Sequence, residues 1–121
     1  YMENMADILG VSLDELSLYS EEPAELSSTC AIFGETEIIA KIVEGYGTDR
    51  LAAGINYTLY KRFASLLNKM ASDVIVLSGG GSKNQALKEI IARERHVEVI
   101  SLDEPQFNGA IGCCIYGKEQ K

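Results

Sequence analysis

The stretch from Val74 to Leu102 constrains the fold most, because it combines two apolar runs, a glycine turn and a helical pattern. Val74–Leu77 is a continuous apolar run, which is typical of a strand buried on both faces. Three glycines follow, and Ser82-Lys83-Asn84-Gln85 has the spacing of a capping box that opens a helix. Val97–Leu102 predicts a second strand. This spacing is that of a βαβ unit, so the two strands should be adjacent and parallel.

Helical patterns precede this unit. Tyr1–Leu9 predicts an amphipathic helix, and Ser12 with Glu15 forms a capping box for a second one. A third helix is expected from about Gly34 to Glu44. Thr48 should be the N-cap of the longest helix, Asp49–Met70, whose apolar stripe indicates packing on the strands.

Two segments carry less defined patterns. The residues from Ala24 to Ala31 fit either a short edge strand or a loop. A last helix of small residues should begin at Asn108 or Gly109 and end near Tyr116. Its Gly109, Ala110 and Gly112 leave one face almost without side chains, which favours tight helix packing over ligand contact.

Length and charge limit the class of protein. With 121 residues and 46% hydrophobic composition, the sequence predicts a single domain over residues 1–121. The net charge of −7, without a basic cluster, argues against nucleic acid as a partner. No apolar run approaches the ~20 residues that span a bilayer, so no membrane partner is expected. Because the chain opens at Tyr1 in mid-pattern, we expect it to be part of a longer protein.

Cysteine usage indicates a reducing compartment. The three cysteines are an odd number and two of them are adjacent, which does not fit a disulfide framework and favours the cytoplasm. Cys113 and Cys114 lie among apolar residues of the last helix, so we interpret both as core residues. His96 stands alone at a strand start and is interpreted as a surface or strand-end residue.

The glycine turn is the first candidate site. Gly79, Gly80 and Gly81 stand between a strand and a capped helix, where backbone can approach a ligand closely. The free N–H groups of the helix N-terminus favour an anion. A tight turn that needs glycine only for positive φ explains the same residues equally well. The pattern is not a Walker A loop.

Cys30 is the second candidate. Ser27, Ser28 and Thr29 precede it, and an apolar helical run follows, which is a setting that presents a thiolate. A lone cysteine is otherwise most often a small buried apolar residue. Glu35 and Glu37 should lie in the first turns of the following helix, where carboxylates stabilise its dipole.

Three segments together resemble the BadF/BadG/BcrA/BcrD ATPase family, the activators of 2-hydroxyacyl-CoA dehydratases and benzoyl-CoA reductases. Thr29–Glu37 resembles the family's Thr-Cys-x-Val-Phe-Ala-Glu-Ser-Glu stretch. Gly79-Gly80-Gly81 with Asn84 looks like its adenosine-binding turn. Gln106–Cys114 looks like its Gln-x-x-Gly-Ala-x-Gly-Ala-Ala tail, with two cysteines in place of alanines. The resemblance covers nearly the whole chain, and the cysteine segment is its specific part.

The resemblance implies an α/β fold: the C-terminal lobe of an actin/sugar-kinase/Hsp70-type (ribonuclease H-like) ATPase, helix-rich with a parallel strand pair. It implies an ATP-dependent electron donor that uses ATP or ADP, magnesium and a 4Fe–4S cluster, forms a homodimer, and acts on a partner dehydratase or reductase. Cys30 would ligate the cluster. The residues implied at the nucleotide are Gly79, Gly80, Gly81, Ser82, Asn84, Gln106 and Gly109.

The resemblance also implies what this chain lacks. The family's phosphate-binding loops, catalytic acidic residues and second cluster cysteine match nothing here, so the fragment should be inactive and should retain no cofactor. Cys30 alone gives a dimer two thiolates, whereas a 4Fe–4S cluster usually takes four. Two alternatives stay open: a lobe of a sugar (N-acetylhexosamine-type) kinase relative, and a non-enzymatic regulatory module of the same fold.

Overall fold

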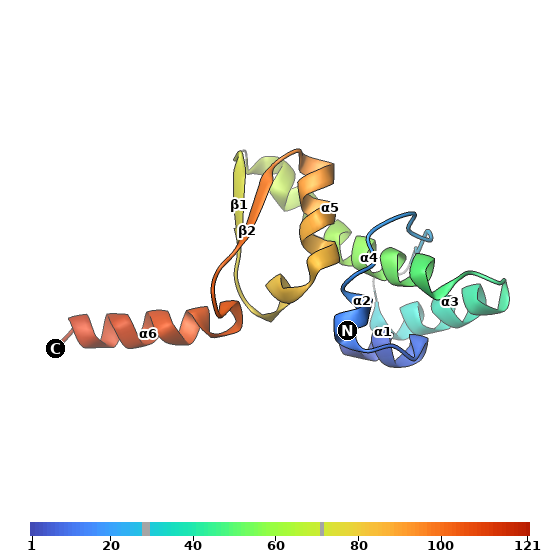
Figure 1. The fold of residues 1–121 in the computed structure, drawn as a ribbon, viewed down its shortest axis with the longest axis horizontal. Coiled ribbons are helices and arrows are strands. Elements are labelled where there is room, and N and C mark those ends of the chain that lie inside the picture. Colours follow the sequence, from blue (N-terminus) through green and yellow to red (C-terminus); the bar gives the residue numbers. More distant parts are fainter. Residues whose placement is uncertain (28–29, 71) are drawn as a thin grey trace.

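The computed structural model describes residues 1–27, 30–70 and 72–121. Figure 1 shows the elements in chain order. These are α1 (Met2–Leu9), α2 (Leu13–Leu16), α3 (Ala31–Val43), α4 (Thr48–Lys69), β1 (Val74–Leu77), the 3₁₀ turn η1 (Gly80–Lys83), α5 (Gln85–Arg95), β2 (Glu98–Ser101), the 3₁₀ turn η2 (Pro105–Phe107) and α6 (Asn108–Glu119).

The βαβ unit forms as predicted. β1 and β2 pair in parallel, with a register that runs from Val74 opposite Glu98 to Leu77 opposite Ser101. Helix α5 connects them and buries Leu87, Ile90 and Ile91 in a core that also contains Tyr60 of α4. Side chains from α4 and from both strands pack around this core, including Phe63, Leu67, Ile75 and Val99. The prediction that the longest helix packs on the strands therefore holds for its second half, residues 57–67, which shares this core with α5 and both strands.

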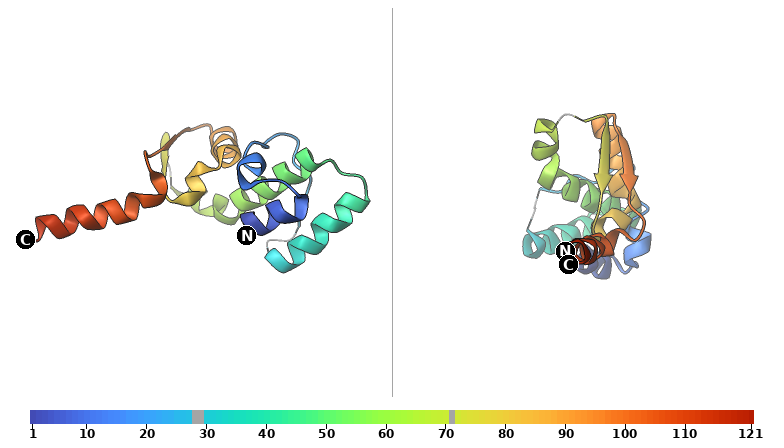
Figure 2. Two further views of the ribbon diagram at one scale, coloured as in Figure 1. Left: turned by 60° about the horizontal axis from the view of Figure 1, so that its bottom comes forward. Right: turned by 90° about the vertical axis from the view of Figure 1, so that its left-hand side faces the viewer.

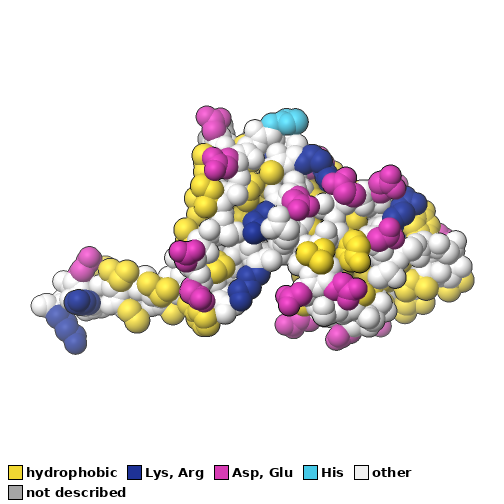
Figure 3. All heavy atoms as spheres, in the orientation of Figure 1, with side chains coloured by type: hydrophobic (Ala, Val, Ile, Leu, Met, Phe, Trp, Pro, Cys, Tyr) yellow, Lys and Arg dark blue, Asp and Glu magenta, His cyan; other side chains and the backbone are white. Residues whose placement is uncertain are grey.

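The prediction that Val74–Leu77 is buried on both faces is wrong. Val74 and Val76 are 40% and 55% exposed, and Ile100 beside them is 41% exposed. The residues between them pack toward α5, so the burial alternates along each strand. The cause is that a two-stranded sheet has its other face open in the part of the chain that the structure describes. Figure 3 shows hydrophobic surface along this outer edge.

A second core holds the N-terminal helices together. It is formed by buried side chains of α1, α2, α3, the loop before α3 and the first half of α4, among them Met5, Leu16, Leu26, Ile38, Leu51 and Ile55. Gly54 permits this packing, because a Cβ there would lie 2.5 Å from the carbonyl oxygen of Ala24. The segment from Ala24 is a loop as far as Ser27, and Ser28 and Thr29 lie outside the described residues.

Helix starts differ from the prediction in three places. Asn84 caps α5, since its Oδ1 accepts from the Leu87 N–H at 2.9 Å, whereas Ser82 lies inside η1. The N-cap of α4 is Gly47, because Thr48 already belongs to the helix. Helix α3 begins at Ala31 and not near Gly34, which places Glu35 and Glu37 beyond its first turn. The Ser12 cap is confirmed by a 3.1 Å bond from the Glu15 N–H.

Helix α6 projects away from the rest of the molecule (Figures 1 and 2), and it contains no buried residue. Cys113 and Cys114 are exposed, so their interpretation as core residues is wrong. Among the described residues, no other element packs against this part of α6. A Cβ added at Gly109 or Gly112 would meet nothing within 4 Å among the described atoms, so the apolar residues beside the two cysteines have no core to enter. The tight packing expected at this face is therefore not made within the described chain. No described helix is long and apolar enough to cross a membrane.

Candidate functional site

The glycine turn divides into two parts. Gly79 adopts φ 84°, a conformation that favours glycine, and its N–H donates to the carbonyl oxygen of Pro105 at 2.7 Å. The Ser82 hydroxyl closes the turn by donating to the Gly79 carbonyl at 2.7 Å. Gly80 and Gly81 have no positive φ, and added Cβ atoms would meet no described atom within 4 Å. Gly79 therefore shapes the turn, while Gly80 and Gly81 leave backbone open to a neighbouring molecule.

A pocket of about 590 Å³ lies against this turn. One wall comes from α1 and α2, and the other from η1, the start of α5 and η2. The side chains and backbone that line it belong to Tyr1, Met2, Glu3, Leu13, Asp14, Ser17, Leu59, Gly80, Gly81, Lys83, Asn84 and Gln106. Its volume is within the range of small-molecule sites.

The structure brings together four of the residues predicted at the nucleotide: Gly80, Gly81, Asn84 and Gln106 line this pocket. Gly79 and Ser82 lie in the same turn without lining it, and Gly109 lies in the first turn of α6. The opposite wall, with Leu13, Asp14 and Ser17, was not predicted. It comes from a segment far away in the sequence that carries no ligand motif, so only the tertiary fold reveals it.

Charge is distributed unevenly around the pocket. Glu3 and Asp14 place carboxylates on the α1–α2 wall, and Lys83 places an ammonium group on the turn. Leu13, Leu59 and Met2 add apolar surface between them. The carboxylates can accept hydrogen bonds from hydroxyl or amino groups of a ligand. The Lys83 ammonium group on the turn can donate to an acidic group of that ligand. The pocket therefore combines apolar lining with acidic side chains from one wall and one lysine from the other.

Tyr1 is held at the edge of this pocket by Arg62 of α4. The Arg62 guanidinium lies over the Tyr1 ring, with 4.1 Å from Cζ to the ring centroid. Burial is the main cause that raises the pKa of the Tyr1 hydroxyl, so the phenol is neutral at physiological pH. A neutral ring fixed by a cation presents a defined apolar edge to the pocket.

Cys30 is the N-cap of α3 and is exposed. Backbone hydrogen bonds from Phe33 and Ile32 lower the pKa of its thiol, and Arg62 adds to the effect. Glu37 of the same helix accepts from the backbone N–H and the hydroxyl of Ser27, at 2.8 and 3.0 Å, which ties the preceding segment to α3. This geometry favours the thiolate form of Cys30 at a helix start.

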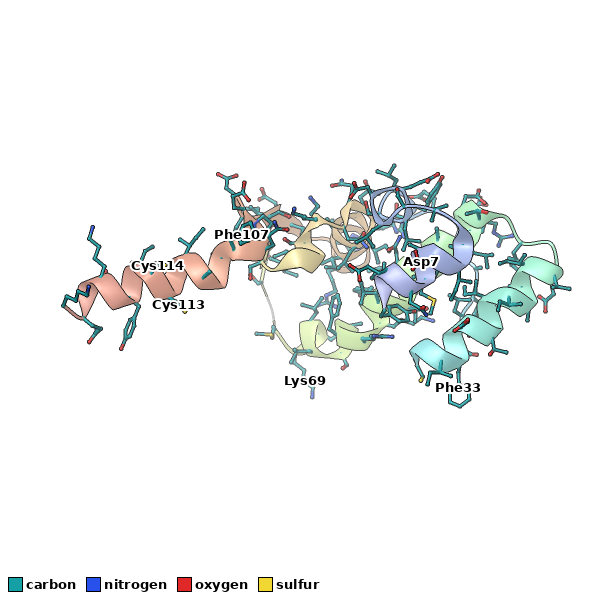
Figure 4. The ribbon with its side chains drawn as sticks, turned by 90° about the horizontal axis from the view of Figure 1, so that it is seen from below. Asp7, Phe33, Lys69, Phe107, Cys113 and Cys114 are labelled. Carbon is teal, nitrogen blue, oxygen red and sulfur yellow. The ribbon has the colours of Figure 1, made fainter. Side chains whose placement is uncertain are left out.

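The residues near Cys30 do not fit a complete iron–sulfur cluster. Cys113 and Cys114 lie on α6, at the opposite end of the molecule (Figure 4). The described residues contain no group of three or more His, Cys, Asp or Glu side chains that could hold a metal ion. One chain therefore offers one thiolate at this place, where a 4Fe–4S cluster usually takes four. Ile32 and Phe33, which follow Cys30 closely in the chain, have side chains that are 75% and 70% exposed.

His96 and a second pocket complete the set of candidate sites. His96 is exposed and ends α5 in the left-handed conformation, φ 54°, as the surface interpretation predicts. A second pocket of about 310 Å³ lies between the loop at Pro23–Leu26 and α4, next to Lys61. It contains none of the predicted site residues.

Comparison with solved structures defines the class. The chain superposes with a TM-score of 0.87 and 32% identity on the activator of the 2-hydroxyisocaproyl-CoA dehydratase from Clostridium difficile with bound ADPNP, over 98% of this chain and 46% of that one. The fold is thus the helix-rich lobe of a dehydratase-activator ATPase, with its small parallel sheet, as the resemblance implied. The chain belongs to the BadF/BadG/BcrA/BcrD ATPase family, which it matches over residues 1–117.

Characterised relatives support the same placement. The chain is 32% identical to the 2-hydroxyisocaproyl-CoA dehydratase activator of Clostridioides difficile, over 99% of this chain and 47% of that protein. It is 31% identical to the (R)-2-hydroxyglutaryl-CoA dehydratase activating ATPase of Acidaminococcus fermentans, over 96% of this chain and 46% of that protein. A component of the benzoyl-CoA reductase of Thauera aromatica is 28% identical, over 97% of this chain and 45% of that protein. The chain therefore spans about half the length of these relatives.

Proposed function

We propose that this chain is the part of an ATP-dependent dehydratase or reductase activator that holds the adenosine side of the nucleotide and one cluster cysteine. The observation that carries the proposal is the pocket of about 590 Å³ over the glycine turn, lined by Gly80, Gly81, Asn84 and Gln106. The bound ADPNP in a structural relative supports a nucleotide as the occupant.

In this role each wall has its own task. The open backbone at Gly80 and Gly81 lets the sugar or the base come close, because no side chain intervenes. Asp14 and Glu3 on the opposite wall accept hydrogen bonds from hydroxyl or amino groups of the nucleoside. Among the described residues that line the pocket, Lys83 is the one with a cationic side chain. The chain by itself therefore binds ATP or ADP weakly and does not hydrolyse them, since phosphoryl transfer needs a grip on the terminal phosphates and the metal.

Cys30 supplies one ligand to an iron–sulfur cluster that is completed by thiolates from outside the described residues. Such a cluster, when bound, supplies one-electron transfer to a partner dehydratase or reductase. The lowered pKa of an exposed thiol at a helix start supports this role, because iron binds the thiolate. It also favours the activator over a sugar-kinase relative, in which nothing calls for a poised thiolate at this place.

The test compares ADP binding by the wild type with binding by a variant whose new side chain fills the pocket and leaves the fold intact. ADP is titrated into the chain while amide resonances are followed by NMR, and shifts at Gly80, Gly81 and Asn84 are expected, with an affinity weaker than micromolar. Gly81→Leu should abolish these shifts, since its side chain enters the open space over the turn. Gly117→Leu, at a second glycine with open surroundings, is the matched control and should bind as the wild type. Tight binding, magnesium-dependent turnover, or unchanged binding by Gly81→Leu would contradict the proposal.

A further inference from the structure

We propose that Asn56 is a positioning residue that holds the two walls of the nucleotide pocket in register. It lies on α4, behind the pocket, and is 0% exposed. Its Nδ2 donates to the carbonyl oxygens of Leu16 and Tyr19, both at 2.8 Å, at the end of α2 and just after it. The Asn56 amide group thus holds in place the segment that brings Asp14 and Ser17 to the pocket.

The same side chain holds the opposite wall. Asn56 Oδ1 accepts from Asn84 Nδ2 at 2.9 Å, and Asn84 Oδ1 accepts from the Leu87 N–H at 2.9 Å. Asn84 is both the N-cap of α5 and a lining residue of the pocket. Asn56 is therefore bonded to both walls through a single buried amide.

Only one orientation of the two amides satisfies this chain of hydrogen bonds. The Leu87 N–H can only donate, so Asn84 must turn its oxygen toward it and its nitrogen toward Asn56. Two carbonyl oxygens can only accept, so Asn56 must turn its nitrogen toward them. Both amides are thus fixed by backbone groups at the two ends, and a residue that cannot both donate twice and accept once does not replace Asn56.

A direct link between the walls depends on this alignment. The Ala86 N–H of α5 donates to the carbonyl oxygen of Ser17 at 2.7 Å. Ser17 follows a helix of four residues, α2, which is too short to keep its direction without tertiary contacts. The Asn56 amide supplies contacts on both sides of Ser17, and so it sets the distance between the acidic wall and the glycine turn.

This inference rests on the proposed function for its ligand, but its first test needs none. In the ligand-free chain, Asn56→Asp removes both donated bonds and should shift the amide resonances of both walls, at Asp14 and Ser17 and at Gly80 and Gly81. Thr58→Val is the matched control, because Thr58 is 1% exposed on the same helix and lines the other pocket. It should leave all four resonances unchanged. Shifts confined to the neighbours of residue 56 would overturn the inference.

A second variant serves if Asn56→Asp does not fold. Asn84→Asp keeps an oxygen for the Leu87 N–H but can no longer donate to Asn56, and its side chain lies at the partly exposed wall. The change is on the turn side, yet it should shift Asp14 and Ser17 on the far side through Asn56. Absence of any shift on the far wall would also overturn the inference.

The ligand arm separates this inference from the proposed function. ADP should bind Asn56→Asp about tenfold more weakly than the wild type, which corresponds to ~1.4 kcal/mol. Thr58→Val should change the affinity less than twofold. If the wild type binds no ADP, the proposed function fails while the ligand-free arm still decides the role of Asn56. If ADP binds wild type and Asn56→Asp equally, the positioning role is wrong and the proposed function stands.

Discussion

Helices α5 and α6 have nearly the same length, 11 and 12 residues, but they hold opposite places in the fold. Helix α5 buries Ala86, Leu87, Ile90 and Ile91, all on one face. Helix α6 buries nothing, and its Ile111, Ile115 and Tyr116 are 48%, 56% and 65% exposed. An isolated helix of this length is marginal in water. The comparison shows that helical pattern alone does not make a helix part of a core.

The largest expected effect is a difference in stability between two matched isoleucines. Ile90→Ala in α5 removes a side chain that is 0% exposed in the core against β1 and β2. We expect it to lower the free energy of unfolding by about 2–5 kcal/mol, because it leaves a cavity. Ile111→Ala in α6 should change it by less than about 0.5 kcal/mol. Urea unfolding followed by circular dichroism measures both, and similar losses would show that α6 is packed in solution.

A pair of glycines sharpens the contrast between packed and projecting helices. Gly54→Ala in α4 places a Cβ 2.5 Å from a backbone oxygen, so we expect a loss of about 1–3 kcal/mol from overpacking. Gly112→Ala in α6 meets no described atom within 4 Å, so it should add up to ~1 kcal/mol of helix propensity. Thermal unfolding and the helical signal of each variant give the answer. A destabilised Gly112→Ala would mean that another surface lies against α6.

The local elements could be predicted because their signals are local. The parallel pair follows from two β-type runs separated by a helical one, and the Ser12 cap follows from a serine three residues before a glutamate. The start of α5 could not be decided in this way. Serine and asparagine are both common N-cap residues, and Ser82 and Asn84 lie only two positions apart. The 3₁₀ turn at Gly80–Lys83 contains Ser82, so Asn84 is the cap.

The residues whose burial was predicted wrongly are those whose burial depends on another layer of structure. The run Val74–Leu77 contains no polar residue, so its sequence predicts two buried faces whether or not a second layer is present. Cys113 and Cys114 were assigned to a core for the same reason. The α2 wall of the pocket could not be predicted either, because Asp14 is brought to the pocket by tertiary contacts, among them the buried Asn56 amide of α4 and the Ala86–Ser17 backbone bond. Sequence patterns identified Gly80, Gly81, Asn84 and Gln106, and tertiary packing supplied the rest of the lining.

The smallest expected effect concerns reactivity and not stability, and it compares the start of α3 with the middle of α6. Cys30, Cys113 and Cys114 are all exposed, so a thiol probe should label all three in the native chain. They differ in their surroundings: Cys30 caps α3, where the Phe33 and Ile32 backbone groups lower its pKa, while the pair lies in the middle of α6. A lowered pKa keeps the thiolate populated as the pH falls. Alkylation of Cys30 should therefore persist to lower pH than that of an ordinary thiol.

The size of this effect is limited by the chemistry of the thiolate. Nucleophilicity falls with pKa, with a Brønsted coefficient of about 0.4–0.5, so on a logarithmic scale only about half of the gain in thiolate population appears as rate. We expect Cys30 to react a few-fold faster than a free thiol of ordinary pKa below neutral pH, and the advantage to vanish or reverse once that free thiol is ionised too. Mass spectrometry of tryptic peptides after timed alkylation at several pH values separates the sites. Cys113→Ser with Cys114→Ser gives the Cys30 rate alone. Equal rates at acid pH would show that the α3 start does not stabilise the thiolate, and the proposed ligand role of Cys30 would lose its physical support.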